Sequence, residues 1–164
     1  DYGCLLVTYS LVVVPSTLIC IFILPSLHVI AMGIGIATFA GTTLALTCAG
    51  CSDPGIVPRR MGDDPSEIPS VSRRPSGSYC GQCNVTRPVG AVHCYDCNCC
   101  VMGLDHHCPW TGKCIGERNL RFFYGFLTFL CLHILSTVVN MAMWMMTVPE
   151  QLSISIARNS TVEP

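Results

Sequence analysis

The stretch that decides the fold of this chain runs from Cys80 to Cys114 and reads CGQCNVTRPVGAVHCYDCNCCVMGLDHHCPWTGKC. It contains eight of the 13 cysteines and three of the 5 histidines in the 164-residue chain. Few of its side chains are apolar enough to build a hydrophobic core, and bound metal replaces such a core in many small domains. We therefore expect metal chemistry to be concentrated here.

Three C-x2-C pairs occur in this segment, formed by Cys80 and Cys83, by Cys94 and Cys97, and by Cys97 and Cys100, and the last two share Cys97. Such a pair lets two thiolates reach one tetrahedral ion from a single turn, and nearby histidines complete the ligand sets. Mixed thiolate and imidazole ligands favour zinc over an iron–sulfur cluster. The segment therefore predicts two structural Zn2+ sites.

The spacing leaves two pairings of these ligands open. A sequential arrangement uses Cys80, Cys83, Cys94 and Cys97 for one ion, and Cys100, His107, Cys108 and Cys114 for the other. In that case Cys108 is a structural ligand. An interleaved arrangement joins Cys80, Cys83, His93 and Cys100 as zinc 1, and Cys94, Cys97, His107 and Cys114 as zinc 2. Cys108 is then left free beside His106.

The interleaved arrangement makes chemical sense of the run Asp105-His106-His107-Cys108. With His107 held by zinc, His106 can accept the proton of Cys108 while Asp105 fixes the tautomer of His106. A thiolate then forms near neutral pH, which predicts a nucleophilic cysteine. A zinc knuckle alone would need neither Asp105 nor a spare thiol.

Long apolar runs flank the cysteine-rich block. The chain is 51% hydrophobic and 12% charged, and residues 2–52 contain no Lys, Arg, Asp or Glu. A small soluble domain cannot hide this much apolar surface from water. The sequence therefore predicts an α-helical integral membrane protein, in which three transmembrane helices carry a small cysteine-rich domain with two zinc sites. A nucleic-acid-binding zinc finger is disfavoured, because the block lacks a basic helix and is tethered to a bilayer.

The predicted organisation follows composition along the chain. Residues 1–51 are expected to form a transmembrane hairpin with helices at 4–24 and 27–49. Residues 52–78 form a linker with little to fold on, and residues 79–121 form the zinc domain. The third helix occupies residues 122–148, and residues 149–164 form a short tail. Each apolar run has about the 20 residues that a helix needs to cross a bilayer. A re-entrant hairpin is the alternative for the third run.

The basic residues predict the orientation in the membrane. Eight of the 9 Lys and Arg residues lie between Arg59 and Arg121. Because loops rich in Lys and Arg remain cytoplasmic, the cysteine-rich domain is expected to face the cytosol. A reducing compartment also agrees with metal-bound rather than disulfide-bonded cysteines.

Some residues within the apolar runs suggest helix packing. His133 and Asn140 are seven residues apart on roughly one helical face, which favours a structural hydrogen bond to another helix. Close approach of a neighbouring helix is one interpretation of the small residues in the second run, and the general frequency of glycine in membrane helices is the other. These residues are Gly33, Gly35, Ala37 and Gly41.

Residues 80 to 123 read C-x2-C-x9-H-C-x2-C-x2-C-x4-D-H-H-C-x5-C-x4-N-x3-F. This pattern resembles the cysteine-rich domain of the DHHC protein S-acyltransferases, the palmitoyltransferases. Asp53-Pro54-Gly55 resembles the D-P-G motif of the same family, and the two preceding helices match the order of elements in that family. The resemblance implies the interleaved ligand pairing, with zinc in a structural rather than a catalytic role.

The resemblance also implies a thioester exchange in two steps. Cys108 would attack palmitoyl-CoA or another long-chain acyl-CoA, hold the acyl group, and pass it to a cysteine of a membrane-associated protein. The site would lie at the cytosolic face of an endomembrane, Golgi or ER, or of the plasma membrane. Lys113, Arg118 and Arg121 are candidates for the CoA phosphates, with anchoring at a cytosolic interface as the alternative.

Other positions either match the family pattern or depart from it. Asn119 and Phe123 match it and are expected to position the third helix, whereas Lys113 stands where Asn is common and Cys99 is an extra thiol, expected to be idle. The family has a fourth helix before a T-T-x-E motif, and here Ser160-Thr161-Val162-Glu163 follows the third apolar run closely. The sequence therefore suggests a fragment or a spliced product. A catalytically impaired, zinc-bearing membrane scaffold is the alternative to an enzyme.

Overall fold

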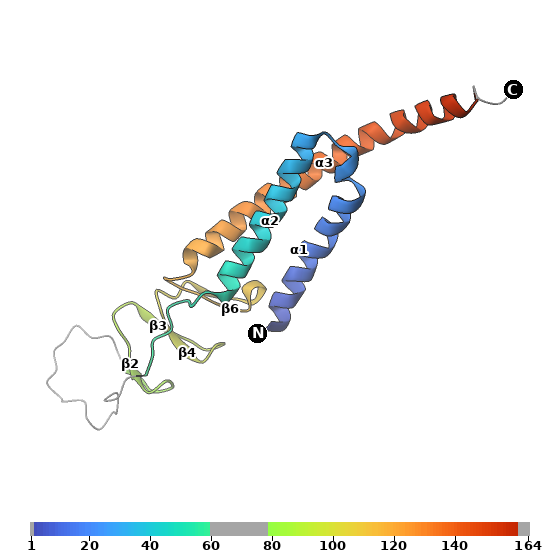
Figure 1. Ribbon diagram of the computed structural model, residues 1–164. Coiled ribbons are helices and arrows are strands. Elements are labelled where there is room, and N and C mark those ends of the chain that lie inside the picture. Colours follow the sequence, from blue (N-terminus) through green and yellow to red (C-terminus); the bar gives the residue numbers. More distant parts are fainter. Residues whose placement is uncertain (1, 60–78, 161–164) are drawn as a thin grey trace. The chain divides into compact units, whose positions relative to one another are not determined.

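The computed structural model describes residues 2–59 and 79–160. Along the chain, the helices α1 and α2 with the short helix η1 between them precede the strands β1 to β6, and α3 follows (Figure 1). The chain divides into two compact units. The cysteine-rich unit comprises Asp1–Ser10 and Leu44–Phe126, and the helical unit comprises Leu11–Thr43 and Leu127–Pro164.

The helices match the apolar runs of the sequence. Their bounds are Tyr2–Phe22 for α1, Leu24–Ser26 for η1, Val29–Cys51 for α2 and Leu120–Ser160 for α3. Three segments are long and apolar enough to cross a membrane: Gly3–Ser26, Val29–Cys51 and Leu120–Pro149. Because α3 is continuous over the third apolar run, the re-entrant alternative is wrong.

The C-terminal end of α3 differs from the prediction. The helix was expected to close before Pro149, but it continues through that residue to Ser160. A proline removes only one backbone N–H donor, and a local adjustment of the helix can accommodate its ring. Good helix formers such as Glu150 and Gln151 follow it. The rest of the predicted Ser160–Glu163 motif lies outside the described residues.

Small residues allow close packing at two positions in the helical unit. An added Cβ at Gly41 would collide with the ring of Phe129, and one at Gly35 would lie 3.1 Å from Nδ2 of Asn140. A Cβ at Gly33 would meet nothing within 4 Å. The close-approach interpretation is therefore confirmed for Gly35 and Gly41 and is wrong for Gly33.

Polar side chains link the helices within this unit. Nε2 of His133 lies 2.8 Å from Oγ of Ser16, and its Nδ1 lies 3.3 Å from Oγ1 of Thr38. Oγ1 of Thr38 also lies 3.0 Å from Oγ of Ser136. These bonds join α3 to α1 and α2, so the predicted structural role of His133 is confirmed. The same prediction is wrong for Asn140, whose carboxamide makes no hydrogen bond with the described residues.

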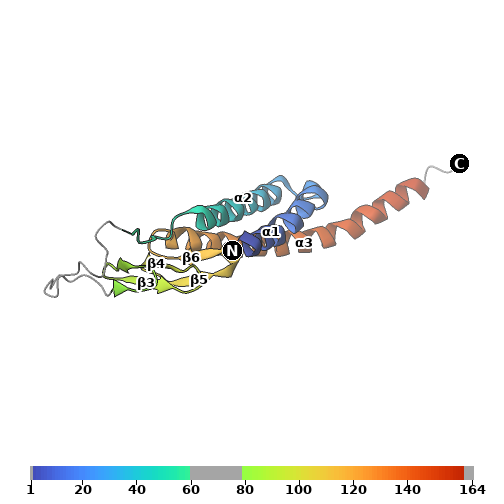
Figure 2. The ribbon, with the colours of Figure 1, turned by 90° about the horizontal axis from the view of Figure 1, so that it is seen from below.

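Antiparallel hairpins build the cysteine-rich unit (Figure 2). Their strands are β1 (Tyr79–Cys80) with β2 (Val85–Thr86), β3 (Ala91–Cys94) with β4 (Cys99–Met102), and β5 (His106–Cys108) with β6 (Lys113–Ile115). The buried clusters between them consist mainly of cysteine. Such clusters provide little apolar area, which agrees with a fold that depends on metal.

The segment that follows α2 packs against β4. Val57 N donates to Cys100 O at 2.8 Å, and Met102 N donates to Gly55 O at 2.8 Å. The prediction of a linker with little to fold on is therefore wrong for residues 53–57, which add a short extended segment to the edge of β4. The remainder of the predicted linker, residues 60–78, lies outside the described residues.

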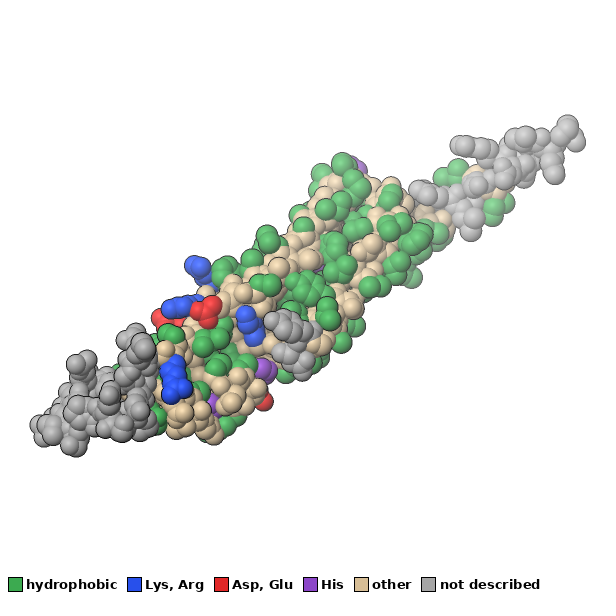
Figure 3. Space-filling model, turned by 60° about the horizontal axis from the view of Figure 1, so that its bottom comes forward, with side chains coloured by type: hydrophobic (Ala, Val, Ile, Leu, Met, Phe, Trp, Pro, Cys, Tyr) green, Lys and Arg blue, Asp and Glu red, His purple; other side chains and the backbone are tan. Residues whose placement is uncertain are grey.

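The surfaces of the two units differ in composition. In the view of Figure 3, the Lys, Arg, Asp and Glu side chains lie over the cysteine-rich unit, whereas hydrophobic side chains cover the helical unit. Many large apolar side chains on the helices are exposed, including Leu11, Leu44 and Leu135. An outward apolar surface on long helices is the pattern expected in lipid.

Candidate metal centres and nucleophile

The first metal cluster consists of Cys80, Cys83, His93 and Cys100. Its ligand atoms all lie within 4.8 Å of one another. Nδ1 of His93 is 3.2 Å from Sγ of Cys83, 3.6 Å from that of Cys80 and 3.8 Å from that of Cys100. His93 faces Cys100 directly across the β3–β4 pair. Strand register therefore brings these distant residues together.

The second metal cluster consists of Cys94, Cys97, His107 and Cys114. Nδ1 of His107 is 3.2 Å from Sγ of Cys97 and 3.9 Å from each of the other two sulfur atoms. His107 faces Cys114 across the β5–β6 pair. Both clusters thus combine one C-x2-C pair with one cross-strand pair of His and Cys.

The alternation of side chains along a strand explains why the ligands interleave. His93 and Cys94 are consecutive in β3, so they point to opposite faces and enter different clusters. Cys99 and Cys100 are likewise consecutive in β4. Cys100 joins the first cluster, while Cys99 faces Cys94 and packs beside the second cluster without belonging to it.

In each cluster, the C-x2-C pair is followed by an asparagine whose backbone has the left-handed conformation. Asn84 follows Cys83 with φ of 52°, and Asn98 follows Cys97 with φ of 50°. Asparagine tolerates this conformation better than other non-glycine residues. The repeated C-x2-C-N sequence therefore has a geometric cause, because the chain must turn sharply after each second cysteine.

The donors in both clusters suit zinc. Three thiols and one imidazole nitrogen form a set that Zn2+ commonly binds in tetrahedral geometry. Burial, with hydrogen bonding to Cys80 and Cys83, raises the pKa of the Cys100 thiol to about 12. A bound cation would favour the thiolate form that ligation requires. The residues present therefore fit two zinc ions.

Cys108 belongs to neither cluster. It lies two residues after His106 in β5, so both side chains are on one face of the strand, whereas His107 is on the other. Cys108 is 4% exposed. The sequential pairing, which required His107 and Cys108 to share one ion, is not the arrangement in the structure.

Asp105 and Phe123 hold the imidazole of His106 from two sides. Oδ2 of Asp105 accepts a hydrogen bond from Nδ1 of His106 at 2.7 Å. The ring of Phe123 meets the His106 ring edge to face, with centroids 5.1 Å apart. With Nδ1 bound to a carboxylate, Nε2 is the nitrogen left to accept a proton. The sequence assigned Phe123 only to helix positioning and gave no signal for this contact.

Asp53 organises the turn that leads from α2 to the cysteine-rich hairpins. Its Oδ1 accepts hydrogen bonds from the backbone N–H groups of Ile56 at 3.0 Å and Gly55 at 2.9 Å. Its Oδ2 lies 2.6 Å from Nη1 of Arg118. The two backbone bonds and then Arg118 hold the pKa of Asp53 below its usual range. Gly55 has φ of 104°, a conformation that favours glycine.

Asn119 is buried at the start of α3. Its Oδ1 accepts a hydrogen bond from Gly116 N at 2.8 Å, and its Nδ2 donates to Cys114 O at 3.0 Å and to Ala49 O at 3.4 Å. One carboxamide therefore connects β6, the last turn of α2 and the start of α3. This arrangement agrees with the predicted positioning role.

The three cations predicted to meet CoA phosphates have neighbours within the chain. Nζ of Lys113 donates to Ser52 O at 2.8 Å, and Arg118 is paired with Asp53. The guanidinium of Arg121 lies 4.7 Å above the ring of Phe122. No motif in the sequence indicated that Lys113 would bind the backbone just after α2, where a cation satisfies a free carbonyl.

Comparison with known proteins places this geometry in a family. A model described as DHHC palmitoyltransferase matches residues 74–161. The chain is 34% identical over 166 residues to "Palmitoyltransferase ZDHHC18-A" of Danio rerio. That alignment covers 84% of this chain and 36% of the relative. It is 32% identical over 177 residues to "Probable protein S-acyltransferase 5" of Arabidopsis thaliana, covering 88% of this chain and 36% of the relative.

A third relative, "Palmitoyltransferase ZDHHC9" of Pongo abelii, is 35% identical over 118 residues, which are 57% of this chain and 32% of that protein. The chain thus spans about a third of the length of these relatives. The family match includes the hairpins that carry both metal clusters and the Asp105–Cys108 run. The chain belongs to the DHHC palmitoyltransferase family.

Proposed function

We propose that this chain carries the catalytic centre of a protein S-acyltransferase that uses Cys108 as its nucleophile. The observation that carries the proposal is the 2.7 Å bond between Asp105 and His106, on the same strand as a cysteine that stands outside both metal clusters. Nucleophile, base and orienting carboxylate are the components of an activated thiol.

The first step forms an acyl-enzyme thioester. Nε2 of His106 accepts the proton of the Cys108 thiol, and Sγ attacks the carbonyl carbon of a long-chain acyl-CoA such as palmitoyl-CoA. The bond between that carbon and the CoA sulfur breaks, and the departing CoA thiolate takes this proton from the imidazolium and leaves as CoA-SH. Asp105 stabilises that imidazolium through Nδ1.

The second step repeats the exchange with a protein thiol. A cysteine of a membrane-associated substrate protein gives its proton to His106 and attacks the carbonyl carbon bound to Cys108. The acyl group moves to the substrate, and Cys108 recovers its proton. The reaction needs no oxidant or energy source, since one thioester replaces another.

Zinc ions in the clusters of Cys80, Cys83, His93 and Cys100, and of Cys94, Cys97, His107 and Cys114, would cross-link the hairpins. With His107 turned into the second cluster, the opposite face of β5 presents His106 and Cys108. Among the cations, Arg121 is exposed and paired with no carboxylate among the described residues, and we assign it, together with Lys113 and Arg118, to the CoA phosphates.

The orientation of the proposed enzyme follows from charge. The excess of basic residues between Arg59 and Arg121 favours a position of the cysteine-rich unit on the cytosolic side of its membrane. Acyl-CoA and the thiols of cytosolic proteins are available on that side. An apolar acyl chain can enter the bilayer there while the charged CoA remains in water.

Incubation of the purified chain with labelled palmitoyl-CoA tests the proposal. The label should be covalent, sensitive to hydroxylamine, and absent from Cys108→Ser. Cys99→Ser is the matched control, because Cys99 is a thiol outside both clusters, and it should retain the label. Label on Cys108→Ser, or normal zinc content with no label on the wild-type chain, would contradict the proposal, and the second result would favour the scaffold alternative.

A further inference from the structure

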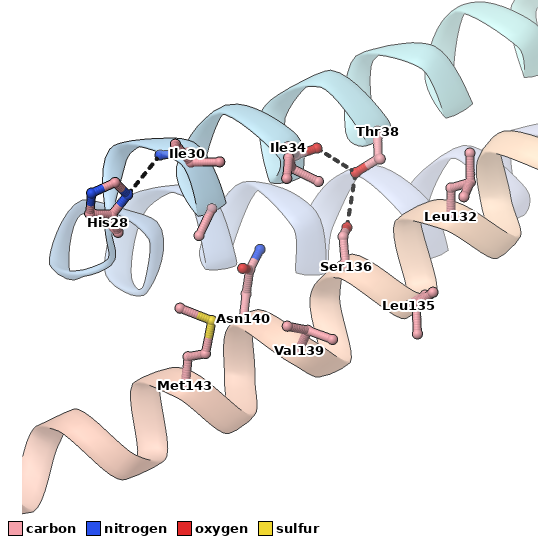
Figure 4. A pocket seen from close by; sticks show the side chains of 11 residues that line it. His28, Ile30, Ile34, Thr38, Leu132, Leu135, Ser136, Val139, Asn140 and Met143 are labelled. Atoms are coloured by element: carbon pink, nitrogen blue, oxygen red, sulfur yellow. Dashed lines mark hydrogen bonds between the residues drawn. The ribbon is translucent and has the colours of Figure 1, made fainter.

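A cavity of about 550 Å³ lies between α2 and α3 in the helical unit (Figure 4). Its walls come from His28, the first half of α2 and the middle of α3, and apolar side chains such as Ile34, Leu132 and Val139 form most of them. None of the lining residues is Lys, Arg, Asp or Glu. The volume lies within the range of sites that hold small ligands.

The polar groups of this cavity are not equivalent. The hydroxyls of Thr38 and Ser136 lie 3.0 Å apart and bond to each other, and Thr38 also bonds to the backbone oxygen atoms of Ile34 and Gly35. Asn140 is 4% exposed, and its carboxamide makes no hydrogen bond with any of residues 2–59 or 79–160. Figure 4 shows this side chain pointing from α3 toward α2 across the cavity.

An unpartnered carboxamide inside an apolar cavity costs free energy, and in lipid no water is present to satisfy it. Gly35 leaves the room that Asn140 occupies, since a Cβ there would lie 3.1 Å from Nδ2. The side chain is therefore accommodated by its neighbours but has no polar partner among them. A ligand in the cavity would supply that partner.

The chemistry of the wall defines the class of ligand. A carboxamide offers two N–H donors and a carbonyl acceptor, and a hydroxyl group can both donate to it and accept from it. The lining contains neither Lys nor Arg, and Nδ1 of His28 accepts a hydrogen bond from Ile30 N at 3.3 Å, so the wall offers no fixed positive charge to a phosphate or carboxylate group. The remaining wall matches hydrocarbon.

We propose that this cavity binds an uncharged membrane lipid that bears one free hydroxyl, of the sterol or diacylglycerol class, with Asn140 bonded to the hydroxyl. The cavity occupies the end of α2 that begins at Val29, and the cysteine-rich hairpins follow the other end of that helix. Lipid binding in this cavity does not depend on acyl transfer.

The test uses the full chain in lipid nanodiscs with a photoactivatable sterol and a photoactivatable diacylglycerol, measured separately. One of these probes should label peptides from α2 and α3 around the cavity. The unlabelled lipid should compete about tenfold better than the same lipid without its hydroxyl, as expected for one buried hydrogen bond. Asn140→Leu, which keeps the number of side-chain heavy atoms and the branch at Cγ, should remove this preference, and Met141→Leu on the exposed neighbouring position should keep it.

A second variant keeps the test decisive if Asn140→Leu fails to fold. Ala31→Phe places a ring in the cavity and should abolish labelling by both probes, while Cys108→Ser should leave labelling unchanged. Equal competition by the hydroxyl-bearing and deoxy lipids in the wild type would overturn the proposal, as would labelling that persists in Ala31→Phe. Displacement of the probe by palmitoyl-CoA in competition, or cross-links between copies of Val139→Cys, would assign the cavity to the acyl donor or to a second copy and would also overturn it.

Discussion

Oδ2 of Asp105 lies 2.7 Å from Nδ1 of His106, while the ring of Phe123 covers the same imidazole at a centroid distance of 5.1 Å. The carboxylate selects the tautomer, and the phenyl ring limits the orientation of the imidazole. The proposed base is therefore fixed by one residue of its own loop and one residue of α3.

Asp105→Asn should slow autoacylation of Cys108 by about 10- to 1000-fold, because an amide stabilises the imidazolium less than a carboxylate and permits the wrong tautomer. Zinc content should remain at the wild-type value, since Asp105 belongs to neither cluster. Single-turnover labelling with palmitoyl-CoA measures the rate. An unchanged rate would remove Asp105 from the mechanism.

Phe123→Ala should reduce the autoacylation rate about tenfold or more, because the imidazole of His106 gains freedom to rotate away from Cys108. Phe122→Ala is the matched control, since Phe122 contacts Arg121 rather than His106. Its effect on the acylation rate at saturating acyl-CoA should be small. Equal effects of the two substitutions on that rate would indicate a general loss of helix packing.

Removal of one ligand should distinguish the clusters from the extra thiol. Cys114→Ser deletes a ligand of the second cluster and should lower the zinc content from about two ions per chain to about one. Cys99→Ser changes a thiol that packs beside the same cluster but lies outside it, and should keep both ions. Metal analysis of the purified variants provides the measurement. Loss of zinc from Cys99→Ser would mean that Cys99 is a ligand.

The pair formed by Asp53 and Arg118 should contribute weakly to stability, because both side chains are about half exposed or more. A double-mutant cycle with Asp53→Asn and Arg118→Gln should give a coupling below about 1 kcal/mol. Asp53→Ala should destabilise more than Asp53→Asn, since alanine also loses the bonds to Gly55 and Ile56.

The same pair gives a prediction for pH. Because the folded state lowers the pKa of Asp53, its contribution is present above the unfolded value near 3.8 and is lost only as pH falls through the lowered pKa. The coupling should therefore be constant between about pH 8 and 6. A coupling that changes over that range in thermal unfolding would contradict the assignment.

Gly41→Ala should destabilise the helical unit by about 1–3 kcal/mol, because the new methyl group collides with the ring of Phe129. Gly33→Ala is the matched control on the same helix, since a Cβ there meets nothing within 4 Å. It should be neutral or slightly stabilising, as alanine is the better helix former. Thermal unfolding in detergent compares the stabilities of the two variants. An equal loss of stability in both would show that helix packing near Gly41 is loose enough to accept a methyl group.

The sequence by itself determined the membrane-spanning runs, the metal-binding character of the block and the special status of the Asp105–Cys108 run. These features follow from local composition: an uninterrupted apolar run must be helical in lipid, and knuckle spacing gives a metal two ligands in one turn. Residues that act over short distances in the chain leave their pattern in the sequence.

Only the tertiary structure decided which ligands share a cluster. The spacing allowed two pairings, and the register of β3 with β4 and of β5 with β6 selected one by placing His93 opposite Cys100 and His107 opposite Cys114. Only the tertiary structure likewise shows the contact of Phe123 with His106, the packing of residues 53–57 on β4 and the unpartnered Asn140. Each depends on chain segments far apart in sequence, whose proximity is set by strand pairing and helix packing rather than by local residue preference.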